Sequence, residues 1–443
     1  MKHLTSIAII AILLFAVPNA EARNNEKNRA EVLAKSRGFY KDIFMDGGIS
    51  LTSRQTLPAS NFLNVSMEFF ASSSNDELTQ TDTLLQSNIF CGSENDTNGW
   101  LLYPDGAPRF RMIYVNGGKA KKHAQSLGDE GRRRIQEFVK NGGSYLGTCA
   151  GAYIASKGSV SHKDNTAKIA KSYWKVWPGF VQSTQLLKSY TPLILEKRSP
   201  LLQYFDFGKD RKVEKVRHNG GCIAVEDNQT TFPDGSEVLA RYQFNNTDKV
   251  HINKKAAIWA YKNNAQNGRV VLCGSHPEGV SEGERLELMS AMLLYAMEGN
   301  PAPQIKGILK GGEIREMNKR TEDKNPVYTR IGDRQYHHFQ IEIPNGCKKA
   351  TIHLDGYEDF KKFDLSLCAK YGDFAYLDSS LLKAEDKGCK KSLTIECPKS
   401  GTWFVSVFCN STVRSITGVY GTTYIGDTSV LNGVPYKVWV EFE

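Results

Sequence analysis

Cys149 is the residue whose surroundings best suit covalent chemistry. It is central in Gly147-Thr148-Cys149-Ala150-Gly151, between an apolar run and a helical pattern. Glycines flanking a nucleophile at a strand-to-helix transition are typical of a nucleophile elbow, because the sharp turn leaves no room for side chains. Such a turn points the sulfur into solvent above the sheet, favours the thiolate at a helix N-terminus, and aims the Ala150 N–H at a developing oxyanion. The alternative is a buried or disulfide-bonded cysteine beside a tight turn.

His276 and Glu278 offer a base and its partner. They follow an apolar run that ends at Cys273, and they precede a helical pattern. A doubly wound sheet presents catalytic side chains at this carboxyl edge. His276 can accept the thiol proton and Glu278 can orient the imidazole, which completes a Cys-His-Glu relay, with Cys273 packed beneath His276. The alternative makes His276 an ordinary polar residue beside a helix.

Other ligand classes have little support. The chain contains no Gly-x-x-x-x-Gly-Lys-Ser/Thr, His-Glu-x-x-His or Cys-x-x-Cys motif, so we expect no cofactor and no metal. The 57 basic and 48 acidic residues give a net charge of +9 without a dense basic block, so we expect no nucleic-acid partner. His337 and His338 alternate along an expected strand, which favours one exposed and one packed imidazole over a metal site.

Residues 40–300 alternate apolar runs with helical patterns, which indicates an α/β domain with a doubly wound parallel sheet. We expect a helix at 129–140 and another that opens with a capping box between Ser281 and Glu284 and closes at 299–301. Strands are expected at 41–45, 65–71, 111–115, 144–147, 257–261 and 269–273.

The pattern changes after an expected linker at 302–326. Short β-type runs separated by turn residues are typical of an all-β sandwich, which we place at 327–443. Its strands are expected at 339–343, 349–354, 364–368, 392–396, 403–408 and 434–441.

Residues 1–22 have the anatomy of a secretory signal peptide. Lys2 and His3 precede an apolar run at 7–17, and Ala20-Glu21-Ala22 supplies a small-x-small cleavage site. That run is too short to span a bilayer, and no later stretch reaches the roughly 20 apolar residues needed. We therefore expect a secreted, extracellular or periplasmic protein with no membrane span, whose first domain covers 23–301; the alternative is an uncleaved N-terminal anchor.

The nine cysteines are an odd number, so in an oxidising compartment at least one thiol stays free. Cys149 is the expected reactive thiol. Cys91 and Cys222 are either a disulfide or two core thiols. The C-terminal domain can hold two disulfides and a further free thiol among Cys347, Cys368, Cys389, Cys397 and Cys409.

A family resemblance rests on these same motifs. Residues 138–153, FVKNGGSYLGTCAGAY, together with Arg217-His218-Asn219-Gly220-Gly221 and the segments at 239–242 and 268–278, resemble the N-terminal domain of biotin-protein ligases, a branch of the class I glutamine amidotransferase-like superfamily. The resemblance covers roughly residues 40–300. It implies a flavodoxin-like three-layer fold, Cys149 as nucleophile, His276 and Glu278 as its partners, and oxyanion-hole amides at Ala150 and Gly118.

The C-terminal region resembles a second family. Residues 336–346, 363–367 and 400–407 look like the bacterial pre-peptidase C-terminal domain, an accessory β-sandwich of secreted hydrolases. In the alternative in which the protein is a silent binding protein, a glycan or protein is the expected ligand of this domain.

The function expected from these features is an exported Cys-dependent hydrolase of an amide or peptide bond, acting on a small amide or peptide through Cys149, His276 and Glu278. A true peptidase is the narrower form of this hypothesis. The alternative is a catalytically silent surface or secreted binding protein that keeps the amidotransferase-like fold.

Overall fold

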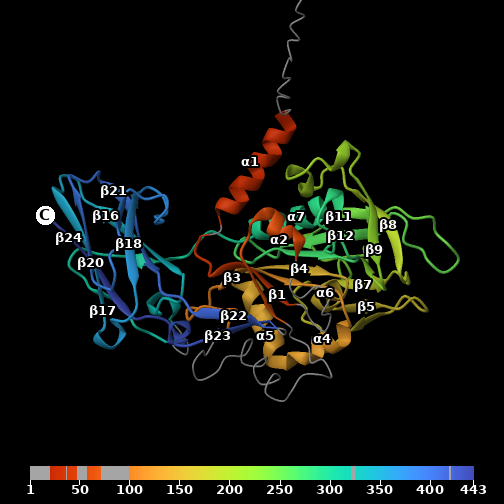
Figure 1. Ribbon diagram of the computed structural model, residues 1–443, viewed down its shortest axis with the longest axis horizontal. Coiled ribbons are helices and arrows are strands. Elements are labelled where there is room, and N and C mark those ends of the chain that lie inside the picture. Colours follow the sequence, from red (N-terminus) through yellow and green to blue (C-terminus); the bar gives the residue numbers. More distant parts are fainter. Residues whose placement is uncertain (1–19, 36, 47–56, 71–98, 321–324, 419–420) are drawn as a thin grey trace, which may run out of the picture.

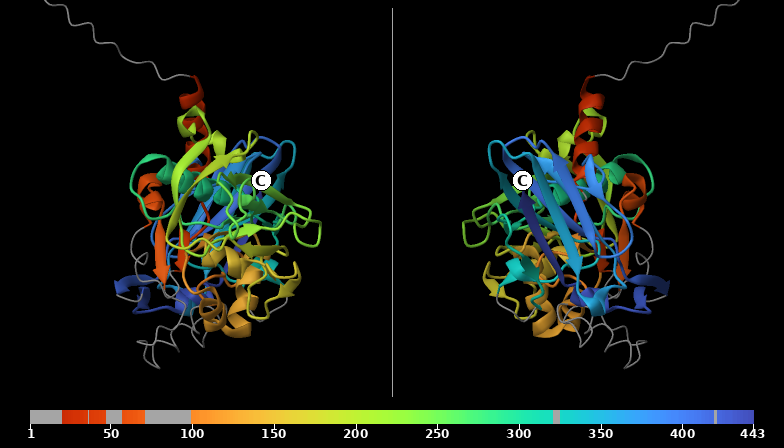
Figure 2. Two further views of the ribbon diagram at one scale, coloured as in Figure 1. Left: turned by 90° about the vertical axis from the view of Figure 1, so that its right-hand side faces the viewer. Right: turned by 90° about the vertical axis from the view of Figure 1, so that its left-hand side faces the viewer.

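The chain forms two main parts, and a helix projects from them (Figure 1). The N-terminal end of helix α1 (Ala20–Ala34) projects from the molecule in both views of Figure 2, while Arg29 and the buried Val32 nearer its C-terminal end contact the α/β part. It includes the expected cleavage site, whereas the apolar run of the expected signal peptide lies outside the described residues. None of the helices described here is long and apolar enough to cross a membrane. The computed structural model describes residues 20–35, 37–46, 57–70, 99–320, 325–418 and 421–443.

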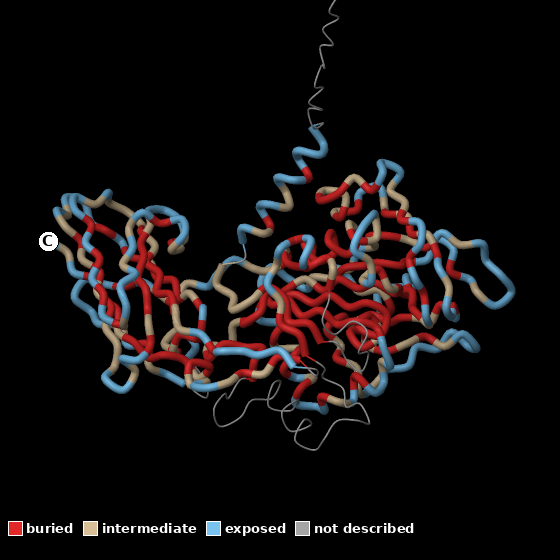
Figure 3. Tube along the Cα trace, in the orientation of Figure 1, coloured by how far each residue is buried: buried red, intermediate tan, exposed pale blue. Residues whose placement is uncertain are grey.

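A run of five parallel strands forms the centre of the larger part. Their order is β2-β1-β3-β4-β13. All residues of β3 and β4 are buried, as expected where a parallel sheet is covered on both faces (Figure 3). The predicted strands are confirmed to within a few residues at each end. Their bounds are β1 Lys41–Asp46, β2 Met67–Phe70, β3 Phe110–Val115, β4 Ser144–Thr148 and β13 Val270–Cys273.

Helices cover both faces of this sheet. Ile113 of β3 belongs to the buried cluster that includes Phe138 of α5 (Gly128–Lys140), whereas the adjacent Met112 belongs to the cluster that includes Met292 of α7 (Gly283–Glu298). Alternation along the strand therefore supplies one apolar surface to each helix layer. The prediction of a mixed α/β fold with a helix at 129–140 is confirmed. The remaining helices are α2 (Pro58–Leu63), α4 (Ala120–Ser126) and α6 (Ala150–Ala155).

The predicted capping box at the start of α7 is wrong. The N-cap is Glu282, and its side chain makes no capping hydrogen bond. Gly283 has a φ of 71°, a conformation that suits glycine, so the chain turns after Ser281 and the helix begins too late for a Ser281–Glu284 box.

Beyond β13 the sheet becomes antiparallel, through β12 (Ala256–Tyr261) to strands that the sequence analysis did not assign. A separate antiparallel extension joins β11, β8 and β9 to β12. These unassigned strands are β5 Gly158–Val160, β6 Ala167–Ile169, β7 Phe180–Ser183, β8 Ser189–Leu195, β9 Lys212–His218, β10 Cys222–Ala224 and β11 Ser236–Tyr242.

The C-terminal part contains a five-stranded and a four-stranded sheet, with the orders β14-β16-β21-β18-β19 and β15-β24-β17-β20. Phe339 on the first sheet and Ile352 on the second belong to one buried cluster. Strands β14 and β15 come from the segment expected to be a linker. The bounds are β14 Ile305–Ile308, β15 Arg315–Met317, β16 Tyr336–Ile343, β17 Lys349–Gly356, β18 Leu365–Tyr371, β19 Leu382–Ala384, β20 Lys391–Glu396, β21 Gly401–Cys409 and β24 Tyr436–Phe442.

A hairpin from the C-terminal region returns to the large sheet. Its strands are β22 (Arg414–Gly418) and β23 (Gly421–Ile425), and Gly421 pairs with Phe70 at the end of β2. The sheet of the α/β part is therefore completed by chain from beyond residue 400.

The eight cysteines that the structure describes are free thiols, and Cys91 lies outside the described residues. The disulfides expected among the described cysteines of the C-terminal part are therefore wrong. In the register of β18 and β21, Cys368 faces Ser406 while Leu365 faces Cys409, so strand alternation sends the two sulfurs to opposite faces of the sheet. The Cys389 thiol donates instead to the carbonyl of Phe363 at 3.1 Å.

The prediction of one exposed imidazole in the His337–His338 pair is also wrong, because both side chains are buried. His337 Nδ1 lies 2.9 Å from the Tyr436 hydroxyl and His338 Nδ1 lies 2.7 Å from the Ser406 hydroxyl. Aromatic rings, including that of Tyr376, cover the face that alternation would otherwise expose.

Candidate active site

Cys149 occupies a strained turn between β4 and α6. Its φ is 47° and its ψ is −104°, a conformation that residues with side chains rarely adopt. The neighbouring glycines make this turn possible. A Cβ on Gly151 would lie 2.2 Å from the Val115 carbonyl oxygen, and one on Gly147 would lie 2.6 Å from the Gly151 backbone. The geometry is that of the elbow expected from the sequence.

The structure brings His276 and Glu278 to Cys149. His276 follows β13. Its backbone N–H donates to the Arg217 carbonyl at 2.8 Å, and its ring Nδ1 lies 2.9 Å from Glu278 Oε1. A Cβ on Gly117 would lie 2.1 Å from His276 Cε1 and 3.3 Å from Cys149 Cβ. The imidazole and the cysteine therefore both lie against the backbone of Gly117, which must stay free of a side chain.

This packing also explains why the sulfur does not point into open solvent as expected. Cys149 is only 4% exposed. Elbow geometry projects the side chain above the sheet edge, but here the Gly117 turn and His276 lie against it.

The electrostatics of the pair favour a charged imidazole. Burial alone would lower the pKa of His276, but hydrogen bonding to the Cys149 side chain and to Glu278 outweighs burial and raises that pKa to about 10. Below His276, burial raises the pKa of the Cys273 thiol to about 12, so this cysteine stays protonated beneath the site as a strand residue. His276 therefore places a positive charge and a transferable proton beside the Cys149 side chain.

This shift predicts a pH-dependent stability. Because the folded-state pKa of His276 lies above its ordinary value of 6.5, its stabilising contribution is complete below pH 6.5 and is lost as the pH rises through about 10. We expect the free energy of unfolding to fall by roughly 2–4 kcal/mol over this range because of His276. Urea unfolding at a series of pH values, compared between wild type and His276→Asn, measures the contribution. Glu278→Gln should shrink it, and equal curves for wild type and His276→Asn would contradict the assignment.

The two residues expected to form an oxyanion hole lie beside the elbow. Ala150 is the first residue of α6, so its N–H is among those that a helix leaves without an intrahelical partner. Gly118 follows the Gly117 turn, and Gly117 is the residue that touches both His276 and the cysteine. The Cys149 N–H is already used, since it donates to the Cys273 carbonyl at 2.9 Å.

His218 is a site residue to which the sequence analysis gave no role, although it noted the surrounding Arg-His-Asn-Gly-Gly segment. It is fully buried, its ring packs at a tilt of 54° against Tyr242 with centroids 4.9 Å apart, and neither ring nitrogen has a hydrogen-bond partner among the residues described here. Burial, assisted by the nearby His276, lowers the pKa of His218 to about 4. His218 therefore places a neutral imidazole behind the charged one. In the described ranges, no cluster of His, Cys, Asp or Glu could hold a metal ion.

The comparison that bears on function covers the elbow and the His276 loop together. Residues 107–292 match the family described as "Biotin-protein ligase, N terminal". A curated relative is the biotin–protein ligase of Schizosaccharomyces pombe (strain 972 / ATCC 24843), which is 28% identical over 205 residues. The match covers 41% of this chain and 29% of the ligase, so the chain spans less than a third of the ligase's length.

Solved structures show only weak similarity. A glutamine amidotransferase covers 42% of this chain and 80% of its own at 17% identity and a TM-score of 0.27. The pre-peptidase C-terminal domain of a Bacillus anthracis collagenase covers 32% of this chain and 99% of its own at 8% identity and a TM-score of 0.19. Values this low decide neither the fold of the C-terminal part nor an activity.

The prediction of an exported amide or peptide hydrolase is wrong. The matched family and the curated relative carry the name of a biotin–protein ligase rather than of a hydrolase, and neither supports export. The chemical reason for the error is that an elbow cysteine with a histidine specifies a nucleophile and its base. It does not specify whether water or another nucleophile resolves the acyl-enzyme.

Proposed function

We propose that this protein performs an acyl transfer related to biotin–protein ligation, in which Cys149 carries the acyl group and an amine accepts it. The observation that carries the proposal is the position of Cys149 at a strained elbow against His276, whose Nδ1 lies 2.9 Å from Glu278. The similarity to a biotin–protein ligase supports an acyl group joined to a protein nucleophile.

Two steps account for the proposed chemistry. The Cys149 thiolate attacks the acyl carbonyl of an activated donor, a carbon–sulfur bond forms, and the leaving group departs with the proton that His276 holds. The neutral imidazole then takes a proton from an amine as its nitrogen attacks the thioester, and the thiolate leaves as the carbon–nitrogen bond forms. The raised pKa of His276 suits the first step, and Glu278 stabilises the charge that the imidazole regains in the second. We assign the Ala150 and Gly118 amides to the developing oxyanion.

The test supplies an activated donor and two competing acceptors. The full chain is incubated with a biotinyl thioester in water, with and without a lysine-containing peptide, and the products are followed by mass spectrometry. We expect a biotinyl adduct mapped to Cys149 and a biotinyl amide on the peptide. Cys397, an exposed thiol far along the chain, is the internal control for unspecific acylation. Adducts on Cys397 alone, or release of free biotin without peptide amide, would reject the transfer.

The finer architecture is also a proposal. We assign residues 23–301 to a flavodoxin-like three-layer domain and residues 327–443 to an accessory β-sandwich. Helices on both faces of the parallel strands and the buried cluster shared by the two C-terminal sheets support this assignment.

A further inference from the structure

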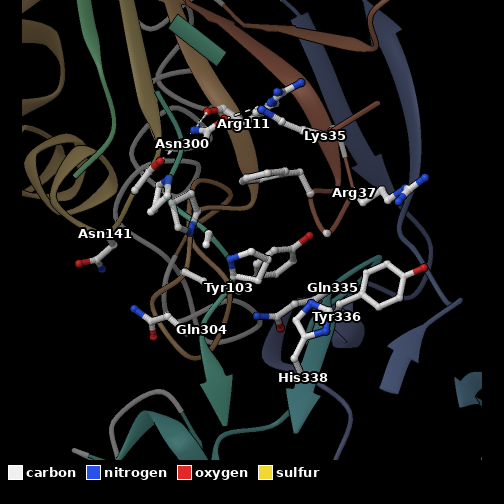
Figure 4. Close-up of a pocket in the computed structure, with 18 of the residues that line it drawn as sticks. Lys35, Arg37, Tyr103, Arg111, Asn141, Asn300, Gln304, Gln335, Tyr336 and His338 are labelled. Atoms are coloured by element: carbon white, nitrogen blue, oxygen red, sulfur yellow. Dashed lines mark hydrogen bonds between the residues drawn. The ribbon is translucent and has the colours of Figure 1, made fainter. Parts of the chain in front are cut away.

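A cavity separate from the candidate active site, called here the second cavity, lies where three segments of the chain meet. Its volume is about 670 Å³, within the range of roughly 300–1,000 Å³ that is common for small-molecule sites. The segment after α1, the rim of the α/β part and strand β16 all contribute to its wall (Figure 4). The described residues that line it do not include Cys149, His276 or Glu278, so it is distinct from the candidate active site.

One end of the cavity is cationic. Figure 4 shows Arg111, Lys35 and Asn300 gathered there. The Arg111 side chain is buried and held in place, because Nε donates to Asn300 Oδ1 at 3.1 Å and Nη2 donates to the Val32 carbonyl at 2.7 Å. Burial lowers the pKa of Arg111 to about 10 despite the opposing effect of Asp42, so nearby anionic charge would stabilise the guanidinium. Lys35 is exposed at the same end.

The two carboxylates in the wall are already engaged. Asp105 accepts from Lys306 at 2.6 Å and from Gln335 at 2.8 Å. Glu298 accepts from the Tyr204 hydroxyl at 2.7 Å. Arg37 also lines the wall, but it pairs with Asp378 at 2.7 Å, so the positive charge that favours an anion comes from Lys35 and Arg111.

The opposite end offers flat rings. Tyr336 stacks on His338 with ring centroids 5.7 Å apart and an interplanar angle of 5°. Burial lowers the pKa of His338 to about 3, so this imidazole is neutral and contributes a ring rather than a charge. In Figure 4, Tyr103 lies between the two ends, and the amides of Asn141 and Gln304 line one side.

We propose that this cavity binds a ring-bearing organic anion, with its phosphate or carboxylate beside Lys35 and Arg111 and its ring packed against Tyr336. The cations at one end of the cavity suit the anionic group of the ligand, and the tyrosine ring at the other end suits its ring. The two ends therefore fix the orientation of the ligand. The Gln304 amide at one side can exchange hydrogen bonds with polar ring substituents, whereas the Asn141 amide already donates to the Gly106 carbonyl at 2.8 Å. The inference stands independently of the acyl-transfer proposal.

The test uses 8-anilinonaphthalene-1-sulfonate, a fluorescent ring-bearing anion, with the full chain. We expect saturable binding at one site, weakened about tenfold by Lys35→Glu and severalfold by Tyr336→Leu. Lys197→Glu is the matched control. It reverses an exposed charge in a separate pocket, lined also by Arg211 and Arg241, and should leave the affinity for the dye unchanged. Circular dichroism checks that each variant is folded.

Displacement identifies the anionic group. Adenosine monophosphate and biotin compete in separate arms, and displacement by the first indicates a phosphate ligand, by the second a carboxylate ligand. Displacement by neither, or equal dye affinity in wild type and folded Lys35→Glu, would overturn the proposal.

Discussion

Replacing Cys149 with alanine is expected to lower acyl transfer from a biotinyl thioester to an amine by about 10³-fold or more. The substitution removes the sulfur to which the acyl group would bind, while His276 and Glu278 stay paired at 2.9 Å. The transfer rate above the uncatalysed background, and the thioester adduct in the intact protein, measure the effect. A Cys149→Ala protein that still transfers the acyl group would exclude Cys149 as its carrier.

Glycine at the same position separates catalysis from backbone strain. The φ of 47° at residue 149 is unfavourable for any residue with a Cβ and accessible to glycine. We therefore expect Cys149→Gly to be as inactive as Cys149→Ala but more stable than it by about 1 kcal/mol. At most positions glycine is less stabilising than alanine. If urea unfolding shows Cys149→Ala to be more stable than Cys149→Gly, the backbone at residue 149 is not strained.

Asp333→Ala is expected to lower the free energy of unfolding by about 3–5 kcal/mol. Both carboxylate oxygens of Asp333 accept from Arg109, at 2.7 Å and 2.8 Å, and both side chains are almost completely buried. Burial alone would lower the pKa of Arg109, but Asp333 more than compensates and holds it well above its ordinary value. Without Asp333, a charged guanidinium stays buried beside fewer acceptors. Urea or thermal unfolding followed by circular dichroism gives the change.

Two comparisons make this prediction specific. Asp427→Ala breaks an exposed ion pair with Lys362 and should cost less than about 1 kcal/mol. The double change Arg109→Met with Asp333→Leu removes both buried charges and should be closer to wild type than Asp333→Ala alone. A loss no larger for Asp333→Ala than for Asp427→Ala would show that the buried pair does not stabilise the fold.

The Arg109–Asp333 pair matters because it joins the two parts of the chain. Arg109 also donates to the Tyr424 hydroxyl at 2.7 Å, and Tyr424 donates to Glu68 at 2.8 Å. Tyr424 stacks on Trp100 with ring centroids 3.8 Å apart. These contacts hold the hairpin β22–β23 against strand β2. Loss of Asp333 is therefore expected to loosen the contact between the two parts of the chain.

The elements near the candidate site were predictable because their determinants are local. An apolar run that ends in Gly147-Thr148-Cys149-Ala150-Gly151 indicates a buried strand followed by a crowded turn. The turn needs glycine because a Cβ at residue 151 would lie only 2.2 Å from the Val115 carbonyl oxygen. The same reasoning placed His276 and Glu278 after a neighbouring strand, at the edge where parallel strands end. The motif does not specify which nucleophile would accept an acyl group, since the same elbow can serve water and amines alike.

The sequence by itself determined the mixed α/β character, the positions of most strands and the elbow around Cys149, because glycine spacing and apolar periodicity act over a few residues. Only the tertiary structure decided that Asp333 pairs with Arg109, that β23 joins β2, that His337 and His338 are both covered, and that the described cysteines stay apart as thiols. Those outcomes depend on which distant segments pack together. The partners of these charged, aromatic and cysteine side chains lie far away in the sequence, so neighbouring residues do not indicate them and they are known only once the chain is folded.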